Sequence, residues 1–175
     1  DEYVGISYEH PESYHKFMKI NLFDHIDIKK ENTHIPDAGN SDLNAALKTY
    51  QEQLNSADID VQILGVGSNG HIGFNEPGTP FEKGVHVVDL KQETIEANSR
   101  FFNNNINLVP KQAVTMGIKD IMRAKHIILL AFGEAKQHAI KSLVEGDEIT
   151  ENIPCTVLKN HPSVYVLVDK EADFK

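Results

Sequence analysis

The sequence lacks the features that mark several classes of protein. Its 175 residues include a single cysteine, Cys155, so neither a disulfide framework nor a cysteine-rich metal site can form. No apolar run approaches the roughly 20 residues that cross a bilayer, and no signal peptide is apparent. The formal net charge of −9 argues against nucleic acids and anionic membranes as partners, because both attract basic surfaces. We therefore expect a cytoplasmic protein, and a small anionic substrate is compatible with this charge.

The composition is that of a soluble globular domain. Hydrophobic residues make up 40% and charged residues 25% of the chain, which is long enough to bury a substantial core. No internal repeat, low-complexity tract or linker divides the sequence, so we expect a single domain over residues 1–175. The chain begins DEYVG without an initiator methionine, and we expect this domain to be N-terminally incomplete.

The spacing of apolar residues predicts strands that alternate with helices. Runs of β-branched and apolar residues predict four strands, at Asp60–Val66, Ala113–Ile118, His126–Phe132 and Ser163–Asp169. Helical spacing and capping residues predict three helices, at Ser13–Ile26, Leu43–Leu54 and Glu134–Glu145. This alternation favours an α/β protein with a three-layer, Rossmann-like fold, in which helices flank a mostly parallel central sheet. Ligands of such sheets bind beyond the carboxyl ends of the strands.

One loop combines flexible backbone with reactive side chains. The strand at Asp60–Val66 runs into the sequence GVGSNGHIGFNEP, whose first glycines satisfy the dinucleotide-binding pattern G-x-G-x-x-G. That pattern should open a helix, whereas the glycines and prolines that follow here would break one, so we do not expect a nucleotide site. The loop instead presents His71, which can exchange protons near neutral pH, and Glu76, which can orient the imidazole or stabilise its charge.

Four separated motifs carry a resemblance to a known family. The glycine loop with HIGFNEP, together with DEYVG, HPESY and ANSRFF, closely resembles glucosamine-6-phosphate deaminases over essentially Asp1–Lys175. These enzymes convert glucosamine 6-phosphate to fructose 6-phosphate and ammonia in amino-sugar catabolism. The related 6-phosphogluconolactonases share the fold and a G-x-G-x-D-G-H loop but lack the N-E-P continuation and the DEYVG motif. A lactonase-like hydrolase and a non-catalytic sugar-phosphate sensor are the alternatives.

The resemblance implies the catalytic residues. His71 moves the proton that opens the sugar ring, and Glu76 holds the imidazole in place. Asp1, the acidic residue that opens DEYVG, is the base that moves a proton from C2 toward C1. Many members have an aspartate before the Gly-His pair, where this chain has Asn69, to which we give a positioning role. No metal or organic cofactor is implied.

The resemblance also implies how the substrate is bound. The partner is an amino sugar phosphate whose phosphate binds Arg100 of ANSRFF and Lys136, which follows a late strand. Gly67 and Gly70 let the substrate approach the backbone. The Gly/Ser/Thr-rich phosphate loop of the family lies upstream of DEYVG, as expected if this chain is N-terminally incomplete. The assembly is expected to be a monomer or a homo-oligomer.

We predict that N-acetylglucosamine 6-phosphate does not activate this protein. Allosterically activated members carry an arginine and a lysine, two residues apart after the N-E-P motif, that bind the phosphate of the activator. His86 and Val88 occupy these places here, and valine offers a phosphate neither charge nor hydrogen bond. Steady-state kinetics should be the same with and without the compound. Sigmoidal kinetics relieved by it would contradict the prediction.

Overall fold

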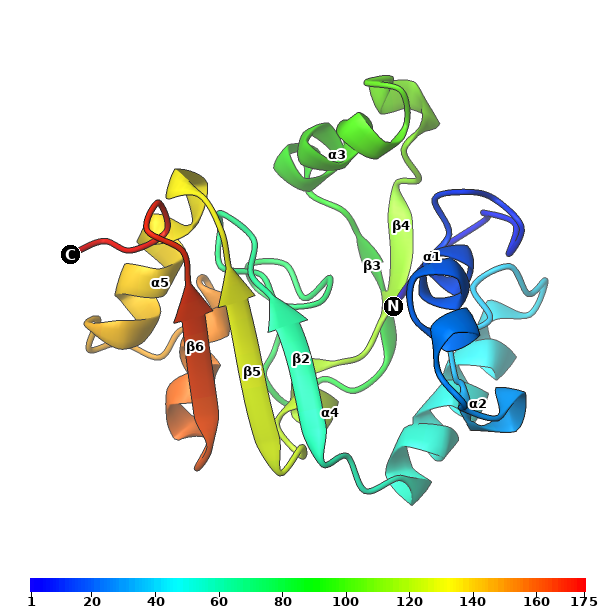
Figure 1. Ribbon diagram of the computed structural model, residues 1–175, viewed down its shortest axis with the longest axis horizontal. Coiled ribbons are helices and arrows are strands. Elements are labelled where there is room, and N and C mark those ends of the chain that lie inside the picture. The colour runs from blue at the N-terminus through cyan, green and yellow to red at the C-terminus, as the bar shows by residue number, and fades with distance from the viewer. The chain divides into compact units, whose positions relative to one another are not determined.

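The computed structural model describes residues 1–175, which separate into two units. The first consists of Asp1–Asn55 and Val85–Thr115, and the second of Ser56–Gly84 and Met116–Lys175. Each unit has its own three-stranded sheet, and the strands are labelled in Figure 1. The prediction of one domain over the whole chain stays a prediction.

The second unit contains the parallel sheet that the sequence predicts. Its strands are β2 (Val61–Gly65), β5 (His126–Ala131) and β6 (Val164–Val168), in the order β2-β5-β6. Both pairings are parallel, so the carboxyl ends of the three strands lie at the same edge (Figure 1). Three of the four predicted strands are thereby confirmed.

One face of this parallel sheet packs against helices. The helical elements of the unit are α4 (Ile118–Ile121), η5 (Glu134–Lys136), α5 (Gln137–Val144) and η6 (Pro154–Asn160). Ile127 and Leu129 of β5 are fully buried and belong to one hydrophobic cluster with Ile140 of α5. The lone Cys155 is buried in the same cluster, and its burial raises the pKa of the thiol to about 12, so it remains protonated.

The opposite face of the parallel sheet is apolar and exposed in this chain. Ile63 of β2 is 62% exposed, and Tyr165 and Leu167 of β6 are 57% and 53% exposed. In Figure 1 no helix of this unit passes in front of β2, β5 and β6 on the face turned to the viewer. Parallel sheets are usually covered on both faces, so this face is unusual for a sheet of its kind.

The sheet of the first unit corrects the expectation of a mostly parallel arrangement. Its strands are β1 (Glu2–Tyr3), β3 (His86–Asp89) and β4 (Gln112–Thr115), and both pairings in the order β1-β4-β3 are antiparallel. The strand predicted at Ala113–Ile118 ends at Thr115, and α4 begins three residues later. The strands β1 and β3 are not predicted by the sequence because such short segments carry little periodic pattern.

Two helices of the first unit begin within one residue of where the sequence predicts, whereas α3 (Gln92–Asn98) is not predicted. In α2 (Leu43–Ser56) the Asp42 carboxylate caps the first turn by accepting a hydrogen bond from the Ala45 amide at 3.0 Å. The predicted helix at Ser13–Ile26 is α1 (Tyr14–Asn21), followed by a separate 3₁₀ turn. The remaining helical elements are η1 (Phe23–His25), η2 (Lys30–Asn32), α3 (Gln92–Asn98), η3 (Ser99–Phe101) and η4 (Ile106–Leu108). Across both units, every helix is too short or too polar to span a membrane.

We predict that the two faces of the parallel sheet differ sharply in their response to truncation. Leu129 is fully buried, so Leu129→Ala should lower the free energy of unfolding by about 2–5 kcal/mol. Leu167→Ala, the same change on the exposed face, is the matched control, and it should lower the free energy of unfolding by about 0.5 kcal/mol or less. Urea unfolding of both variants measures the difference. Equal losses would show that this assignment of faces is wrong.

Candidate functional site

The glycine loop leaves the carboxyl edge of the parallel sheet and folds back on itself. It begins where β2 ends, at Gly65. The Gly67 amide donates to the His71 carbonyl oxygen at 2.9 Å, and the Gly70 amide donates to the Gly67 carbonyl oxygen at 3.0 Å. Further along, Asn75 is fully buried, and its Nδ2 donates to the carbonyl oxygens of Ile72 and Met116. The loop is therefore a hydrogen-bonded structure at the edge where ligands of α/β sheets bind.

Gly67 and Gly70 make room for the protein's own side chains. A Cβ atom at Gly67 would lie 2.3 Å from Cε1 and Nδ1 of His71, so the imidazole packs directly on this glycine. Gly70 has a φ of +86°, and a Cβ atom there would lie 2.5 Å from the Ile153 side chain. Gly67 therefore makes room for the His71 ring, and Gly70 makes room for the Ile153 side chain. That the substrate approaches the loop backbone at these two glycines stays a prediction.

Asn69 joins His71 to Glu76. Its Oδ1 accepts hydrogen bonds from the His71 amide at 3.1 Å and from the imidazole Nδ1 at 2.8 Å. Its Nδ2 donates to Oε2 of Glu76 at 3.0 Å. The direct separation between Nδ1 of His71 and Oε2 of Glu76 is 3.5 Å, so Asn69 is the nearer partner of the imidazole.

This arrangement decides which imidazole nitrogen can react. A carboxylate only accepts hydrogen bonds, so the Asn69 amide group must direct Nδ2 to Glu76 and Oδ1 to His71. Because Oδ1 also only accepts, Nδ1 of His71 carries a proton, and Nε2 of the neutral ring has the lone pair. The His71 side chain is 21% exposed, whereas that of Glu76 is 3% exposed. The imidazole is thus open to a substrate and supported from behind by a buried carboxylate.

Lys136 follows the neighbouring strand of the same sheet. Lys136 is the last residue of η5, which begins directly after Gly133 and follows the carboxyl end of β5. The Ala172 and Gly133 amides both donate to the Asp169 carboxylate, and these bonds, that from Ala172 most, lower the pKa of Asp169. Lys136 and the glycine loop therefore leave the same edge of the sheet, as the sequence predicts for a phosphate ligand.

The other three motifs meet in the first unit. Tyr3 of DEYVG is buried, and its ring lies 5.5 Å from that of Tyr14 in HPESY and 5.8 Å from that of Phe102 in ANSRFF. Its hydroxyl accepts a hydrogen bond from Nδ2 of Asn98 at 3.0 Å. Burial raises the pKa of Tyr3 to about 12, so the hydroxyl stays protonated. These three motifs, which are far apart in the sequence, therefore form one aromatic cluster in the structure.

Asp1 is held by a residue that the sequence does not point to. The Thr115 hydroxyl donates to Oδ1 of Asp1 at 2.9 Å. Thr115 is fully buried at the end of β4, which pairs with β1 so that Glu2 faces Val114. No local pattern around Thr115 distinguishes it, because only the antiparallel register brings it to Asp1.

Arg100 lies in a constrained turn of the first unit. It belongs to η3, and its guanidinium group is 4.7 Å from the centre of the Phe101 ring. Asn103 and Asn104 follow with φ angles of 57°, the left-handed conformation that asparagine tolerates better than most residues. The side chain of Arg100 is exposed and takes part in no ion pair of the structure, as a predicted phosphate ligand requires.

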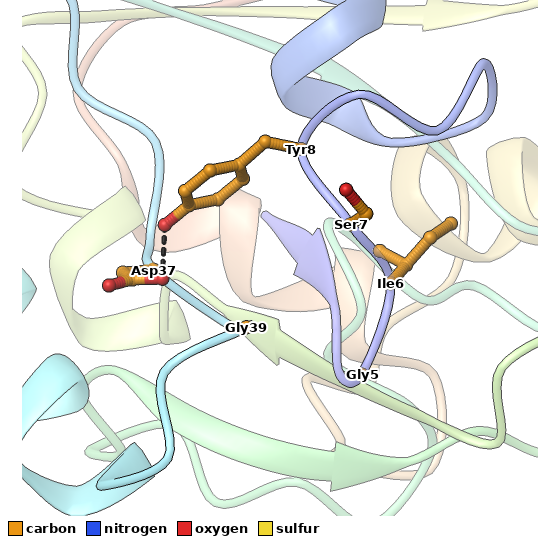
Figure 2. Close-up of a pocket in the computed structure, with 6 residues that line it drawn as sticks. All are labelled: Gly5, Ile6, Ser7, Tyr8, Asp37 and Gly39. Atoms are coloured by element: carbon orange, nitrogen blue, oxygen red, sulfur yellow. Dashed lines mark hydrogen bonds between the residues drawn. The ribbon is translucent and has the colours of Figure 1, made fainter.

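A cavity of about 380 Å³ lies beside DEYVG in the first unit. Figure 2 shows residues 5–8 along one wall and Asp37 and Gly39 along the other. The Tyr8 hydroxyl reaches across and donates to the Asp37 carboxylate, and burial together with this carboxylate raises the pKa of Tyr8. None of the predicted site residues lines the cavity, so we do not assign the substrate to it.

Comparison with known families matches the chain over most of its length. The family described as glucosamine-6-phosphate isomerases/6-phosphogluconolactonase matches residues 4–166. The chain belongs to this family. Among its curated members, the glucosamine-6-phosphate deaminase of Thermoanaerobacter pseudethanolicus is 51% identical over 173 residues, 98% of this chain and 68% of the relative. The deaminase of Streptococcus thermophilus is 53% identical over 175 residues, all of this chain and 73% of the relative.

Solved structures of the family separate the deaminases from the lactonases. A monomeric glucosamine-6-phosphate deaminase is 46% identical and superposes with a TM-score of 0.94, over 98% of this chain and 70% of that one. The 6-phosphogluconolactonase of Trypanosoma brucei is 22% identical with a TM-score of 0.72, over 98% of this chain and 70% of that one. The similarity to the lactonase shows a shared fold, whereas the sequence identity to the deaminase is about twice as high.

We predict that Asn69→Asp leaves turnover in place and moves its pH profile. A carboxylate at this position would place one oxygen about as close to the imidazole as Oδ1 is now and the other against Oε2 of Glu76. The two neighbouring carboxylates would together stabilise the imidazolium form. Because ring opening needs the neutral imidazole of His71, the acid limb of the pH profile of kcat/KM should move to higher pH by about one unit. The pH dependence of ammonia release measures this shift.

The control for this prediction is Asn69→Ala, which removes all three hydrogen bonds of the Asn69 side chain without adding charge. This variant should lose turnover at every pH rather than shift the profile, because the imidazole is no longer held. Complete loss of turnover in a folded Asn69→Asp protein would contradict the prediction.

Proposed function

We propose that this chain converts glucosamine 6-phosphate and water to fructose 6-phosphate and ammonia. The observation that carries the proposal is the His71–Asn69–Glu76 arrangement, in a chain about half identical to glucosamine-6-phosphate deaminases over its whole length. Asp1, held by Thr115, supplies the second acid–base group. The reaction then follows from the chemistry of these side chains.

Ring opening is the task of His71. Its Nε2 accepts the proton of the anomeric hydroxyl and returns a proton to the ring oxygen, which gives the open-chain aldehyde. The imidazolium that forms in between has the Asn69 amide oxygen at its Nδ1 and the Glu76 carboxylate at 3.5 Å. These partners stabilise the charged ring and keep it in one orientation.

Isomerisation and deamination are the task of Asp1. Its carboxylate removes the C2 proton of the open-chain amino aldehyde while O1 takes up a proton, which gives an enolamine. The carboxylate then delivers its proton to C1 as the nitrogen gives one up. The product is an imine at C2 with a hydroxymethyl group at C1. Addition of water to this imine and loss of ammonia leave the ketose phosphate. A carboxylate suits the transfer because both carbons lie along one face of a planar intermediate.

Arg100 and Lys136 are the proposed ligands of the substrate phosphate. Arginine offers a planar fork of donors that matches two phosphate oxygens. Lys136 lies at the start of α5, where the dipole of the helix also favours an anion. The two cations would fix one end of an open-chain sugar whose other end undergoes the reaction.

The same proposal covers the three-layer arrangement of the fold, the oligomeric state and the location in the cell. A three-layer arrangement is supported by the exposed apolar face of β2 and β6, which a third layer would bury. The chain spans about 70% of its relatives, including the monomeric deaminase, so that structure has additional sequence. We propose a monomer in the cytoplasm, since the solved relative is described as monomeric and the only cysteine is buried and protonated.

Ammonia release from glucosamine 6-phosphate tests the proposed activity. His71→Gln and Asp1→Asn should each lower kcat by about 10²–10⁴-fold, since each removes an acid–base group. His138→Gln and Asp147→Asn, both on exposed side chains, are matched controls that should behave as the unaltered protein does. An unaltered protein that binds the sugar phosphate without releasing ammonia would favour a sensor. Hydrolysis of 6-phosphogluconolactone in its place would favour a lactonase.

A further inference from the structure

A second carboxylate beside Asp1 is completely buried. Glu2 has no exposed surface, although it belongs to a two-residue strand near the end of the chain. Its Oε1 accepts hydrogen bonds from the amides of Tyr3 at 2.9 Å and Tyr14 at 3.0 Å. Its Oε2 accepts a hydrogen bond from the amide of His15 at 2.9 Å. Three backbone donors therefore converge on one side chain.

Two of these donors belong to the first turn of α1. A helix leaves its first four amides without partners inside the helix. Ser13, the residue before α1, accepts from the Lys16 amide through its side chain and from the Phe17 amide through its carbonyl oxygen. Glu2 accepts the remaining two, so a residue from β1 completes the cap of a helix that begins twelve residues later.

The cost of burying a charge fixes both the position and the orientation of the Glu2 side chain. A buried carboxylate is strongly unfavourable unless donors meet its oxygens. Both oxygens of Glu2 have backbone donors, and the helix N-terminus adds a favourable dipole. Any rotation of the side chain or shift of its backbone would leave a buried charge and buried amides without partners. Glu2 consequently locks β1 against α1.

We propose that Glu2 is a positioning residue for Asp1. The inference rests on the proposed function, in which the Asp1 carboxylate moves a proton between C2 and C1. Asp1 precedes Glu2 directly, so fixing Glu2 also fixes the backbone from which the Asp1 side chain projects. The Thr115 hydroxyl then sets the direction of the carboxylate itself. A shift of about 1 Å in such a group can cost 10²-fold in rate, which gives this anchoring a catalytic consequence.

Glu2→Gln tests the proposal with almost no change in size. The glutamine oxygen can keep the bonds from Tyr3 and Tyr14, but its amide nitrogen meets the His15 amide donor to donor. We expect kcat per folded molecule to fall by about 10–100-fold, with KM nearly unchanged. The kinetic isotope effect of deuterium at C2 should be at least as large as in the unaltered protein, because C2 proton transfer is the slowed step.

Ser13→Ala is the matched control for damage to α1. It removes the other side-chain cap of the same helix end and leaves the Glu2 carboxylate with its three donors. This variant should retain kcat per folded molecule even if it unfolds at a lower temperature. A loss as large as that of Glu2→Gln would show that α1 stability, rather than the position of Asp1, controls turnover.

Thr115→Val and Thr115→Ser keep the proposal testable should Glu2→Gln fail to fold. Valine removes the hydroxyl that donates to Asp1 with little change in shape, whereas serine retains it. We expect turnover to fall with valine and to be restored with serine. Unchanged kcat per folded molecule in the Glu2 and Thr115→Val proteins, or a loss confined to KM, would overturn the inference. Absence of ammonia release from the unaltered protein would instead overturn the proposed function on which it rests.

Discussion

The contact on which the candidate site depends is that of the His71 imidazole with the backbone of Gly67. A side chain at position 67 would occupy the place of the ring, so the loop can hold His71 only because that residue is glycine. The same contact brings Nδ1 to Asn69, whose amide group is itself oriented by Glu76. Steric exclusion thus places the ring, and hydrogen bonding then decides which nitrogen carries the proton. The reactivity of Nε2 is a consequence of both.

Each unit places a buried carboxylate next to a proposed acid–base residue. In the second unit Glu76 reaches His71 through Asn69, and in the first unit Glu2 directly precedes Asp1. The two carboxylates differ in their partners, since Glu76 faces side chains whereas Glu2 is met by backbone amides alone. A side-chain partner can respond to the charge of the imidazole during turnover. Backbone donors provide a fixed anchor for the neighbouring Asp1.

Much of the second unit could be predicted from the sequence, and much less of the first. The strands β2, β5 and β6 are apolar runs, and the hydrogen bonds that join His71, Asn69 and Glu76 link residues at most seven apart, so local patterns indicate both. The sheet of the first unit joins residues 2–3 to 112–115, and such short strands are defined by their pairing. For that reason the aromatic contacts of Tyr3 with Phe102 and the bond from Thr115 to Asp1 escape a reading of the sequence.

The sequence by itself determined the chemistry available to this protein. It placed His71, Asn69 and Glu76 at the end of a buried strand, and its four motifs implied a family that the comparisons bear out. The tertiary structure alone decided how that chemistry is held. It packed the His71 imidazole directly on Gly67, and it made Asn69 the nearer partner of His71. It also buried Glu2, because side-chain contacts between distant segments depend on register and packing, which no local pattern encodes.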